Sequence, residues 1–139
     1  MDAPQSIQAE FTATLATNQT PHWWLAQFGW TNDFDAAALD DPDEDGFATW
    51  QEYITDTDPT DGEDYLQPMM ATGTTSSLAF HLDPTSTGRL YFIDVTEDLV
   101  APDWSNVTNA PGTGGPWNPV IPSPDSQFHF YRGRVFPPP

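Results

Sequence analysis

The chain has 139 residues, enough for one domain of ordinary size or for two small modules. Its 21 acidic and three basic residues give a formal net charge of −18, which would repel nucleic acid and anionic membrane surfaces. The lack of cysteine excludes disulfides, thiol catalysis and thiolate metal sites, and no apolar run approaches membrane-spanning length.

The first predicted element is a β-strand over residues 6–15, in which apolar and polar side chains alternate with the two-residue period of a strand. No hairpin partner follows it in the sequence. Its pairing partner is therefore expected far along the chain or on another molecule. The polar residues 16–20 that follow are typical of a hinge, so residues 1–19 are interpreted as an N-terminal β-strand arm and hinge.

Residues 20–64 are predicted to form a small helical module, with helices over residues 22–28, 34–39 and 50–55. Thr20 and Pro21 are typical first residues of a helix, and Gly29 is a typical stop. Asn32 or Asp33 is expected to cap the second helix. The expected inward-facing side chains are Trp23, Trp24, Phe28, Trp50, Tyr53 and Ile54. Of these, Trp23, Trp24, Trp50 and Tyr53 are expected to pack against the β domain.

A twelve-residue loop with the spacing of an EF-hand calcium site lies between the second and third helices, at residues 41–52. Ca²⁺ takes about six to eight oxygen ligands, and carboxylates occupy the first, third, fifth and twelfth positions of this loop. Gly46, at the sixth position, permits a sharp turn. The seventh position offers its backbone carbonyl, and the ninth usually acts through a water. The expected calcium ligands are Asp41, Asp43, Asp45, Phe47, Thr49 and Glu52.

Thirteen of the 21 acidic residues lie between residues 33 and 64. Such a concentration of like charge is unfavourable unless a cation lies among the acids, although acidic runs are also common in solvated loops. The glutamate at the twelfth position favours calcium over a simple solvated loop. Four further acids could form a second calcium site, lend an outer ligand to the first, or belong to a turn: Asp56, Asp58, Asp61 and Asp64.

Residues 65–139 are expected to form an antiparallel β domain with a proline-rich tail. Strands are predicted over residues 77–82, 89–96, 104–108, 117–121 and 127–135, with turns that contain glycine or proline between them. This spacing is typical of a small antiparallel sandwich or barrel. The predicted fold class is therefore mainly β with a small α calcium module: an N-terminal strand, short helices around an EF-hand-type loop, and an antiparallel β-sandwich.

Other candidate sites have less support in the sequence. His22, His81 and His129 are far apart, so three separate histidines are expected more than a zinc site. No serine, histidine and aspartate combination has the context of a catalytic triad, and we expect no enzymatic activity. Trp104 and Trp117 are candidates for an exposed platform that would stack on sugars.

Residues 20–59 resemble the calcium-binding module related to bacterial thrombospondin type 3 repeats and EF-hands. The residues that carry the resemblance are Pro21, Trp23, Trp24, Phe28 and Gly29, then Asp41, Asp43, Asp45 and Gly46, then Trp50, Glu52, Tyr53 and Ile54, and finally Thr57, Asp58 and Pro59. In such proteins a short β domain typically follows, with motifs similar to Leu78, Ala79 and Phe80 and to residues 130–135 here. The resemblance implies a calcium-stabilised module of a secreted bacterial surface protein.

From these features we predict a secreted, non-enzymatic, calcium-stabilised structural protein, extracellular or at the cell surface. The N-terminus has no basic or apolar signal region, so the protein is either not exported by that route or a mature form whose signal was removed. The acidic, lysine-free composition and the expected calcium site favour the mature form. The unpaired strand predicts a homo-polymer, a filament or tube built by addition to a neighbour's sheet edge. Pairing of that strand within its own sandwich is the alternative. A carbohydrate-binding or adhesion module with a polysaccharide partner is the second functional possibility. Neither a nucleic-acid partner nor membrane insertion is expected.

Overall fold

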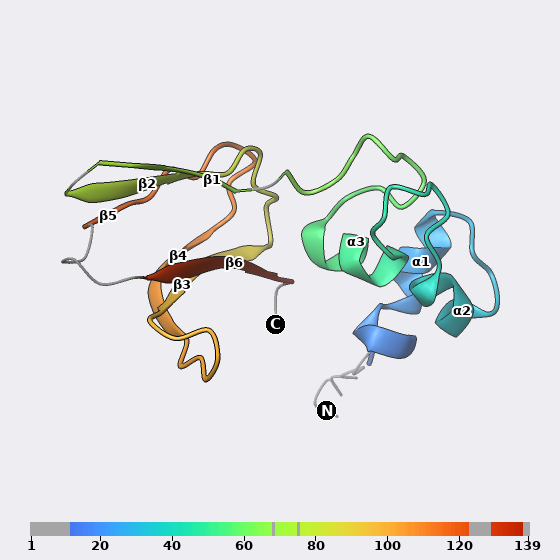
Figure 1. Ribbon diagram of the computed structural model, residues 1–139. Coiled ribbons are helices and arrows are strands. Elements are labelled where there is room, and N and C mark those ends of the chain that lie inside the picture. Colours follow the sequence, from blue (N-terminus) through green and yellow to red (C-terminus); the bar gives the residue numbers. More distant parts are fainter. Residues whose placement is uncertain (1–11, 68, 75, 123–128, 138–139) are drawn as a thin grey trace, which may run out of the picture.

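The computed structural model describes residues 12–67, 69–74, 76–122 and 129–137. The molecule has two parts that lie side by side, a helical part from the first half of the chain and a β-sandwich from the second (Figure 1). Within the described residues, the helical part contains the short 3₁₀ helix η1 (Thr17–Gln19) and the α-helices α1 (His22–Gln27), α2 (Phe34–Leu39) and α3 (Thr49–Thr55).

The α-helices lie where the sequence predicts them, and their ends differ from the prediction by at most one residue. Pro21 is extended and precedes α1, so the helix begins one position later than its proline suggests. Gly29 ends α1 with a φ of 98°, a left-handed conformation that costs glycine little. Asp33 directly precedes α2, but its side chain makes no capping hydrogen bond.

The core of the helical part is centred on α1. Its buried side chains are Ala16, Trp24, Leu25, Ala37 and Ala38, and the partly buried Phe28, Trp30, Phe34, Trp50 and Tyr53 pack against them. The ring of Trp24 meets those of Phe28 and Tyr53 edge to face, at centroid distances of 4.8 and 5.3 Å. The prediction that Trp23 belongs to this core is wrong, because Trp23 is 57% exposed. Neighbouring residues on a helix with about 3.6 residues per turn point in different directions, so α1 buries one of its two adjacent tryptophans.

The predicted N-terminal strand over residues 6–15 lies mostly outside the described residues. In the described part, Leu15 pairs with Pro21 in an isolated antiparallel bridge. The predicted hinge is instead a turn fixed to α2, because the N–H and the hydroxyl of Thr17 both donate to Asp35 Oδ1, at 2.7 and 2.9 Å. Polar residues signal a hinge only where their side chains find no partner, and here Asp35 supplies one.

The second half of the chain forms two antiparallel three-stranded sheets among the described residues, in the orders β1-β2-β5 and β4-β3-β6. Their strands are β1 (Met70–Gly73), β2 (Ser77–His81), β3 (Leu90–Thr96), β4 (Ser105–Pro111), β5 (Val120–Pro122) and β6 (Phe130–Phe136). Phe80, Ile93 and Ile121 are buried between the sheets. The mainly β, sandwich-like architecture is thus confirmed.

Details of the sandwich differ from the prediction, among them the strand expected over residues 117–121, which is observed as β5 and begins at Val120. β1 was not predicted, and its four residues are all exposed, so they lack the alternation that marks a half-buried strand. Trp117 packs against the buried cluster between the sheets, so it is no open platform. Trp104 is half-buried and lies beneath the guanidinium group of Arg132, whose carbon is 4.3 Å from the ring centroid.

The two parts are joined through Arg89, which directly precedes β3. Its side chain donates to the backbone carbonyls of Tyr53 and Ile54 in the last turn of α3, at 2.5 and 2.8 Å. The expected role of Trp23 and Trp24 in joining the two parts is therefore wrong: one is exposed and the other lies in the helical core. A polar contact from the sandwich to the end of α3 is thus a link that the sequence did not predict.

Candidate metal centre

The acidic loop connects α2 with α3, and hydrogen bonds hold its two ends together. The backbone carbonyl of Asp40 accepts two hydrogen bonds from Thr49, one from its backbone N–H at 2.8 Å and one from its side-chain hydroxyl at 3.1 Å. Gln51 Oε1 accepts the N–H of Ala48 at 2.8 Å, which satisfies one free donor at the start of α3. These hydrogen bonds therefore hold the two ends of the loop together, and the ends cannot separate without breaking them.

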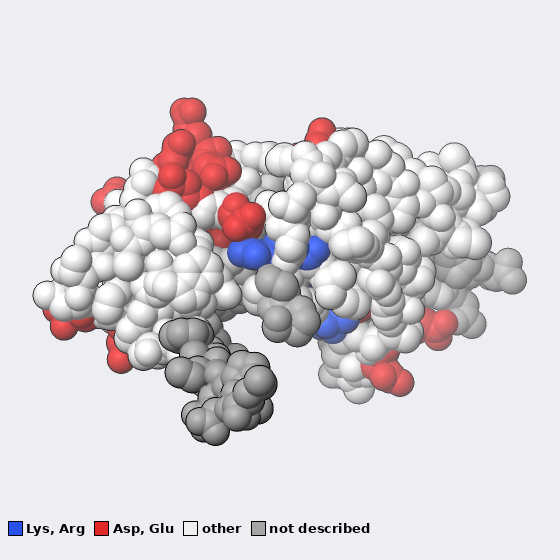
Figure 2. Space-filling view, turned by 180° about the vertical axis from the view of Figure 1, so that it is seen from behind, with Lys and Arg blue, Asp and Glu red and all other residues white. Residues whose placement is uncertain are grey.

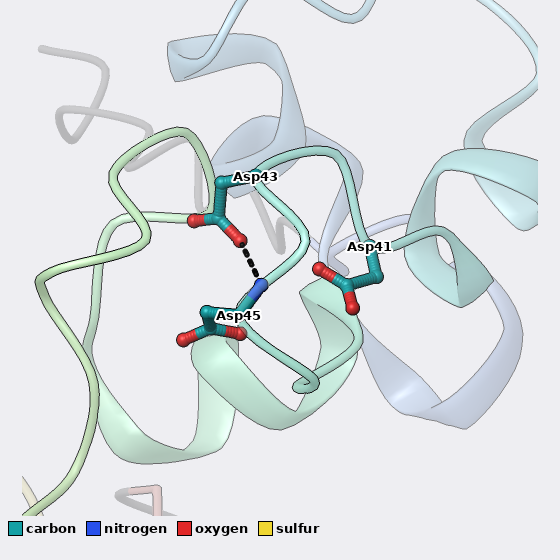
Figure 3. Close-up of side chains that lie close together, drawn as sticks. All are labelled: Asp41, Asp43 and Asp45. Carbon is teal, nitrogen blue, oxygen red and sulfur yellow. Dashed lines mark hydrogen bonds between the residues drawn. The ribbon is translucent and has the colours of Figure 1, made fainter.

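Each of the three loop aspartates uses one carboxylate oxygen to fold the loop backbone. Asp41 Oδ2 accepts the N–H of Gly46 at 3.1 Å, Asp43 Oδ1 that of Asp45 at 3.2 Å, and Asp45 Oδ1 that of Phe47 at 2.8 Å. The bond between Asp43 and Asp45 is drawn in Figure 3. Gly46 has a φ of 98°, so a residue without Cβ suits the turn at this position.

The second oxygen of each aspartate is buried and has no hydrogen-bond partner among the described residues: Asp41 Oδ1, Asp43 Oδ2 and Asp45 Oδ2. The three side chains come from one loop and lie close together (Figure 3), with one oxygen of each within 4.8 Å of the others. Burial raises the pKa of the Asp43 carboxyl, and the charges of Asp45 and Asp41 add to this effect. The group could hold a metal ion.

Glu52, the middle residue of α3, is a buried carboxylate that is close enough to feel the charges of these aspartates, but it is not one of the three residues whose oxygens lie within 4.8 Å of one another. It is 1% exposed, and neither of its carboxylate oxygens has a hydrogen-bond partner in the described part of the chain. Burial, and to a smaller extent the charges of Asp43, Asp45 and Asp41, together raise the pKa of Glu52 to about 8. A buried acid with no donor facing it is costly unless a positive charge compensates it.

The remaining two predicted ligands have other contacts. The hydroxyl of Thr49 donates to the carbonyl of Asp40, so its hydrogen is already used to close the loop. Phe47 donates its N–H to Asp45, and its side chain lines a cavity of about 320 Å³ together with Leu82 and Val135 of the sandwich. The sequence pattern identified both positions, but it could not show their hydrogen bonds.

The acids after α3 form a turn that supports the loop. Asp58, Asp61 and Asp64 each accept a backbone N–H from this same turn. Gly62 lies against the loop so closely that a Cβ at this position would be 3.2 Å from the backbone oxygen of Asp43. Within the described residues, the three loop aspartates are the group able to hold a metal ion, and no second cluster of this kind is found.

The three histidines have separate environments. His22 stacks on Phe34 at a centroid distance of 4.1 Å, and His81 Nδ1 lies 2.5 Å from Asn118 Oδ1. His129 Nε2 lies 3.4 Å from Glu97 Oε1. The structure therefore does not bring these side chains together as a zinc site would require.

Acidic side chains gather over the helical part of the molecule, at the upper left of Figure 2, and the few basic side chains lie near the middle of this face. Two residues that shape the site were missed in the sequence, Gly62 and Arg89. Gly62 lies in an acidic, glycine-containing segment, which predicts a turn but does not predict that Gly62 packs against Asp43. Arg89 is one of only three basic residues, and no local pattern indicates which carboxylate it meets.

Comparisons with protein-family models, with curated proteins and with solved structures found no match. Within the described residues, every helix is too short or too polar to cross a lipid bilayer.

Proposed function

We propose that this protein is a secreted, non-enzymatic structural protein, in which Ca²⁺ bound by residues 41–52 holds the helical part folded. One observation carries the proposal. Five buried carboxylate oxygens, on Asp41, Asp43, Asp45 and Glu52, have no hydrogen-bond partner among the described residues. Each aspartate folds the loop with its other oxygen, so the free oxygens are left for an ion.

The chemistry of these donors favours calcium over other cations. All of them are oxygens, which suit a hard cation, whereas Zn²⁺ is bound mainly by nitrogen and sulfur. Mg²⁺ is smaller, requires nearly ideal octahedral geometry and retains several waters. The spacing of the four carboxylates matches the EF-hand loop, in which the carbonyl of Phe47 and a water next to Thr49 would complete the shell.

Calcium would act here as a structural clamp. Its ligands come from the loop and from α3, and the loop follows α2 directly, so the ion would fix these elements relative to one another. Because the four carboxylates repel one another without the ion, its binding energy contributes to folding. An affinity in the range of extracellular modules, roughly 10⁻⁴–10⁻³ M, suits a protein that works outside the cell. The chain's lack of lysine and its acidity also favour an exported protein.

The proposed role is a subunit of an extracellular filament or tube. Its support is the alternating pattern of residues 6–15, which favours strand addition to a sheet edge. Among the described residues, β1 and β5 are the outer strands of one sheet, and β4 and β6 those of the other, so these strands are candidates for such an addition. A carbohydrate-binding or adhesion module is the second candidate. The exposed Trp23 favours it, because an exposed indole ring can stack on a sugar.

The calcium proposal is tested by titrating the metal-free full chain with Ca²⁺ and, separately, with Mg²⁺ in a calorimeter. Calcium at about 100 times its dissociation constant should stabilise the fold by about 2.7 kcal/mol, and raise the melting temperature by several degrees. Mg²⁺ should bind more weakly, and a chelator should reverse the stabilisation. If neither heat of binding nor a change in melting temperature is seen with Ca²⁺, the proposal is wrong.

A further inference from the structure

Arg89 of the sandwich closes the end of α3. It is 7% exposed, and its Nε donates to the carbonyl of Ile54 at 2.8 Å. Its Nη2 donates to the carbonyl of Tyr53 at 2.5 Å and to Asp56 Oδ1 at 3.2 Å. The guanidinium carbon also lies 5.5 Å from the centroid of the Tyr53 ring. One side chain thus holds the last turn of the helix in four ways.

The physical reason for this contact is the end of α3. The last carbonyls of a helix have no partner within it, and the partial negative charge there favours a cation. α3 has no basic residue in its own last turn, so the sandwich supplies the charge. The planar fork of arginine can reach two carbonyls and a carboxylate at once, which the single ammonium of lysine cannot do with the same geometry.

Glu52, the middle residue of α3, directly precedes the residues that Arg89 holds. The backbone carbonyl of Glu52 accepts the N–H groups of Asp56 and Thr57, at 2.7 and 3.1 Å. Asp56 is the residue whose carboxylate pairs with Arg89, and Tyr53 directly follows Glu52. The path from the sandwich to the metal centre is therefore one turn of a seven-residue helix.

We infer that Arg89 is a positioning residue for the metal centre, so that docking of the sandwich on α3 and binding of the ion through Glu52 strengthen each other. This inference rests on the proposed function, since it requires an ion in the loop. Coupling between two binding events is reciprocal, so the ion stiffens the junction as much as the junction improves the site. The metal centre then controls how firmly the two parts of the molecule are joined.

The test compares calcium affinity by calorimetry in the full-length wild type, R89A, R89K and the control R132A. All are measured at a temperature at which near-ultraviolet circular dichroism shows a folded protein. R89A is expected to bind Ca²⁺ about tenfold more weakly, within the usual range of allosteric coupling. R89K keeps the charge but loses the fork, so part of the affinity should be lost. Arg132 belongs to the same sandwich but pairs with Asp94, and R132A should keep its affinity within about twofold.

The outcomes separate the inference from the proposed function. A wild type that does not bind Ca²⁺ overturns both. A wild type that binds Ca²⁺, together with R89A of unchanged affinity, overturns the inference alone, because Arg89 would then merely cap the helix. Should R89A fail to fold, R89K decides the matter, and wild-type affinity in R89K overturns the inference. A loss of affinity in R132A equal to that in R89A would also overturn it, since the effect would not be specific to the junction.

Discussion

Glu52 is the residue in which burial and charge conflict most clearly. A carboxylate that is 1% exposed and has no donor among the described residues would ordinarily be replaced by an apolar side chain, or be paired. The pKa of about 8 shows that the metal-free fold favours its protonated form. Its presence is accounted for if the folded protein holds a cation beside it. The same carboxylate then destabilises the metal-free protein and stabilises the loaded one.

This dual role predicts that E52Q has opposite effects in the two states. Without metal, the pKa of Glu52 in the folded state lies above its unfolded value of 4.5. The folded protein therefore loses stability as the pH rises from 4.5 to 8 and this carboxyl is forced to ionise. At pH 7 metal-free E52Q should thus be more stable than the metal-free wild type by about 1–3 kcal/mol. In calcium the order should reverse. Thermal unfolding with chelator and with Ca²⁺ measures both.

The control for this comparison is E44Q, which removes the same charge from an exposed loop position that is not a predicted ligand. Its stability should change little in either state. The prediction fails if E52Q and E44Q respond alike to calcium.

Asp94 is a buried acid of the opposite kind. It is 1% exposed and accepts hydrogen bonds from Arg134, Arg132 and Asn106. The bonds from Arg134, then those from Arg132 and Asn106, hold the pKa of Asp94 below its usual value despite burial. A depressed pKa contributes stability that is complete above the unfolded value of 3.8, and is lost as pH falls through the folded value.

The wild type should therefore be more stable than D94N at pH 6, and this advantage should shrink below about pH 4. Urea unfolding of both proteins at a series of pH values measures the difference, and the many other acids cancel in the comparison. A difference between the two proteins that is constant down to pH 2 would contradict the assigned cause.

At the scale of elements, the loop and its two flanking helices show what sequence can predict. Helix boundaries followed from breakers and caps such as Gly29 and Pro21, since these act locally through backbone geometry. The spacing of Asp41, Asp43 and Asp45 predicted that these side chains lie together, and they do. Two contacts could not be predicted in this way: the hydrogen bond from the Thr49 hydroxyl to Asp40, and the packing of Gly62 on Asp43. Both depend on how the chain returns to the loop.

Gly46 and Gly29 offer a matched test of the loop. Both have a φ of 98°, and a Cβ at either position would meet no atom within 4 Å, so alanine brings only backbone strain. G46A and G29A should each lose about 1–2 kcal/mol of stability, as measured by urea unfolding. Only G46A should also lose calcium affinity, because the N–H of Gly46 donates to Asp41 Oδ2 and so helps to position this carboxylate. Equal affinities in the two variants would show that the loop turn does not shape the site.

For the whole molecule, the mainly β, sandwich-like architecture with short helices was predictable and the junction was not. Segments with alternating apolar and polar residues, such as residues 90–96, allowed the strands of the antiparallel sheets to be predicted, because a two-residue period is a local signal. β1 escaped prediction because its residues are exposed and it is held by pairing with β2, a contact that no local pattern indicates. The contact of Arg89 with Tyr53 and Ile54 joins residues far apart in the sequence, and only the tertiary fold brings them together.

Assembly through the N-terminal strand is tested by deleting residues 1–11. This deletion spares Ala16, which belongs to the helical core, and Thr14, whose carbonyl accepts the N–H of His22. We expect the full chain to form large particles in calcium and the shortened chain to remain monomeric, by sedimentation velocity and electron microscopy. W23A is a control with a shortened exposed side chain and an intact strand segment. If the full and shortened chains have the same size distribution, assembly through this segment is excluded.

The pairing of the arginines determines how copies of this molecule meet in solution. Arg89 pairs with Asp56, and Arg132 and Arg134 share Asp94, so every arginine is already matched by a carboxylate of its own chain. The remaining charge, −18 in total, must be balanced by an atmosphere of mobile ions. Two such polyanions approach closely only when salt shortens the range of their repulsion, to about 10 Å at 0.1 M. Ionic strength therefore governs how closely copies of this molecule approach one another.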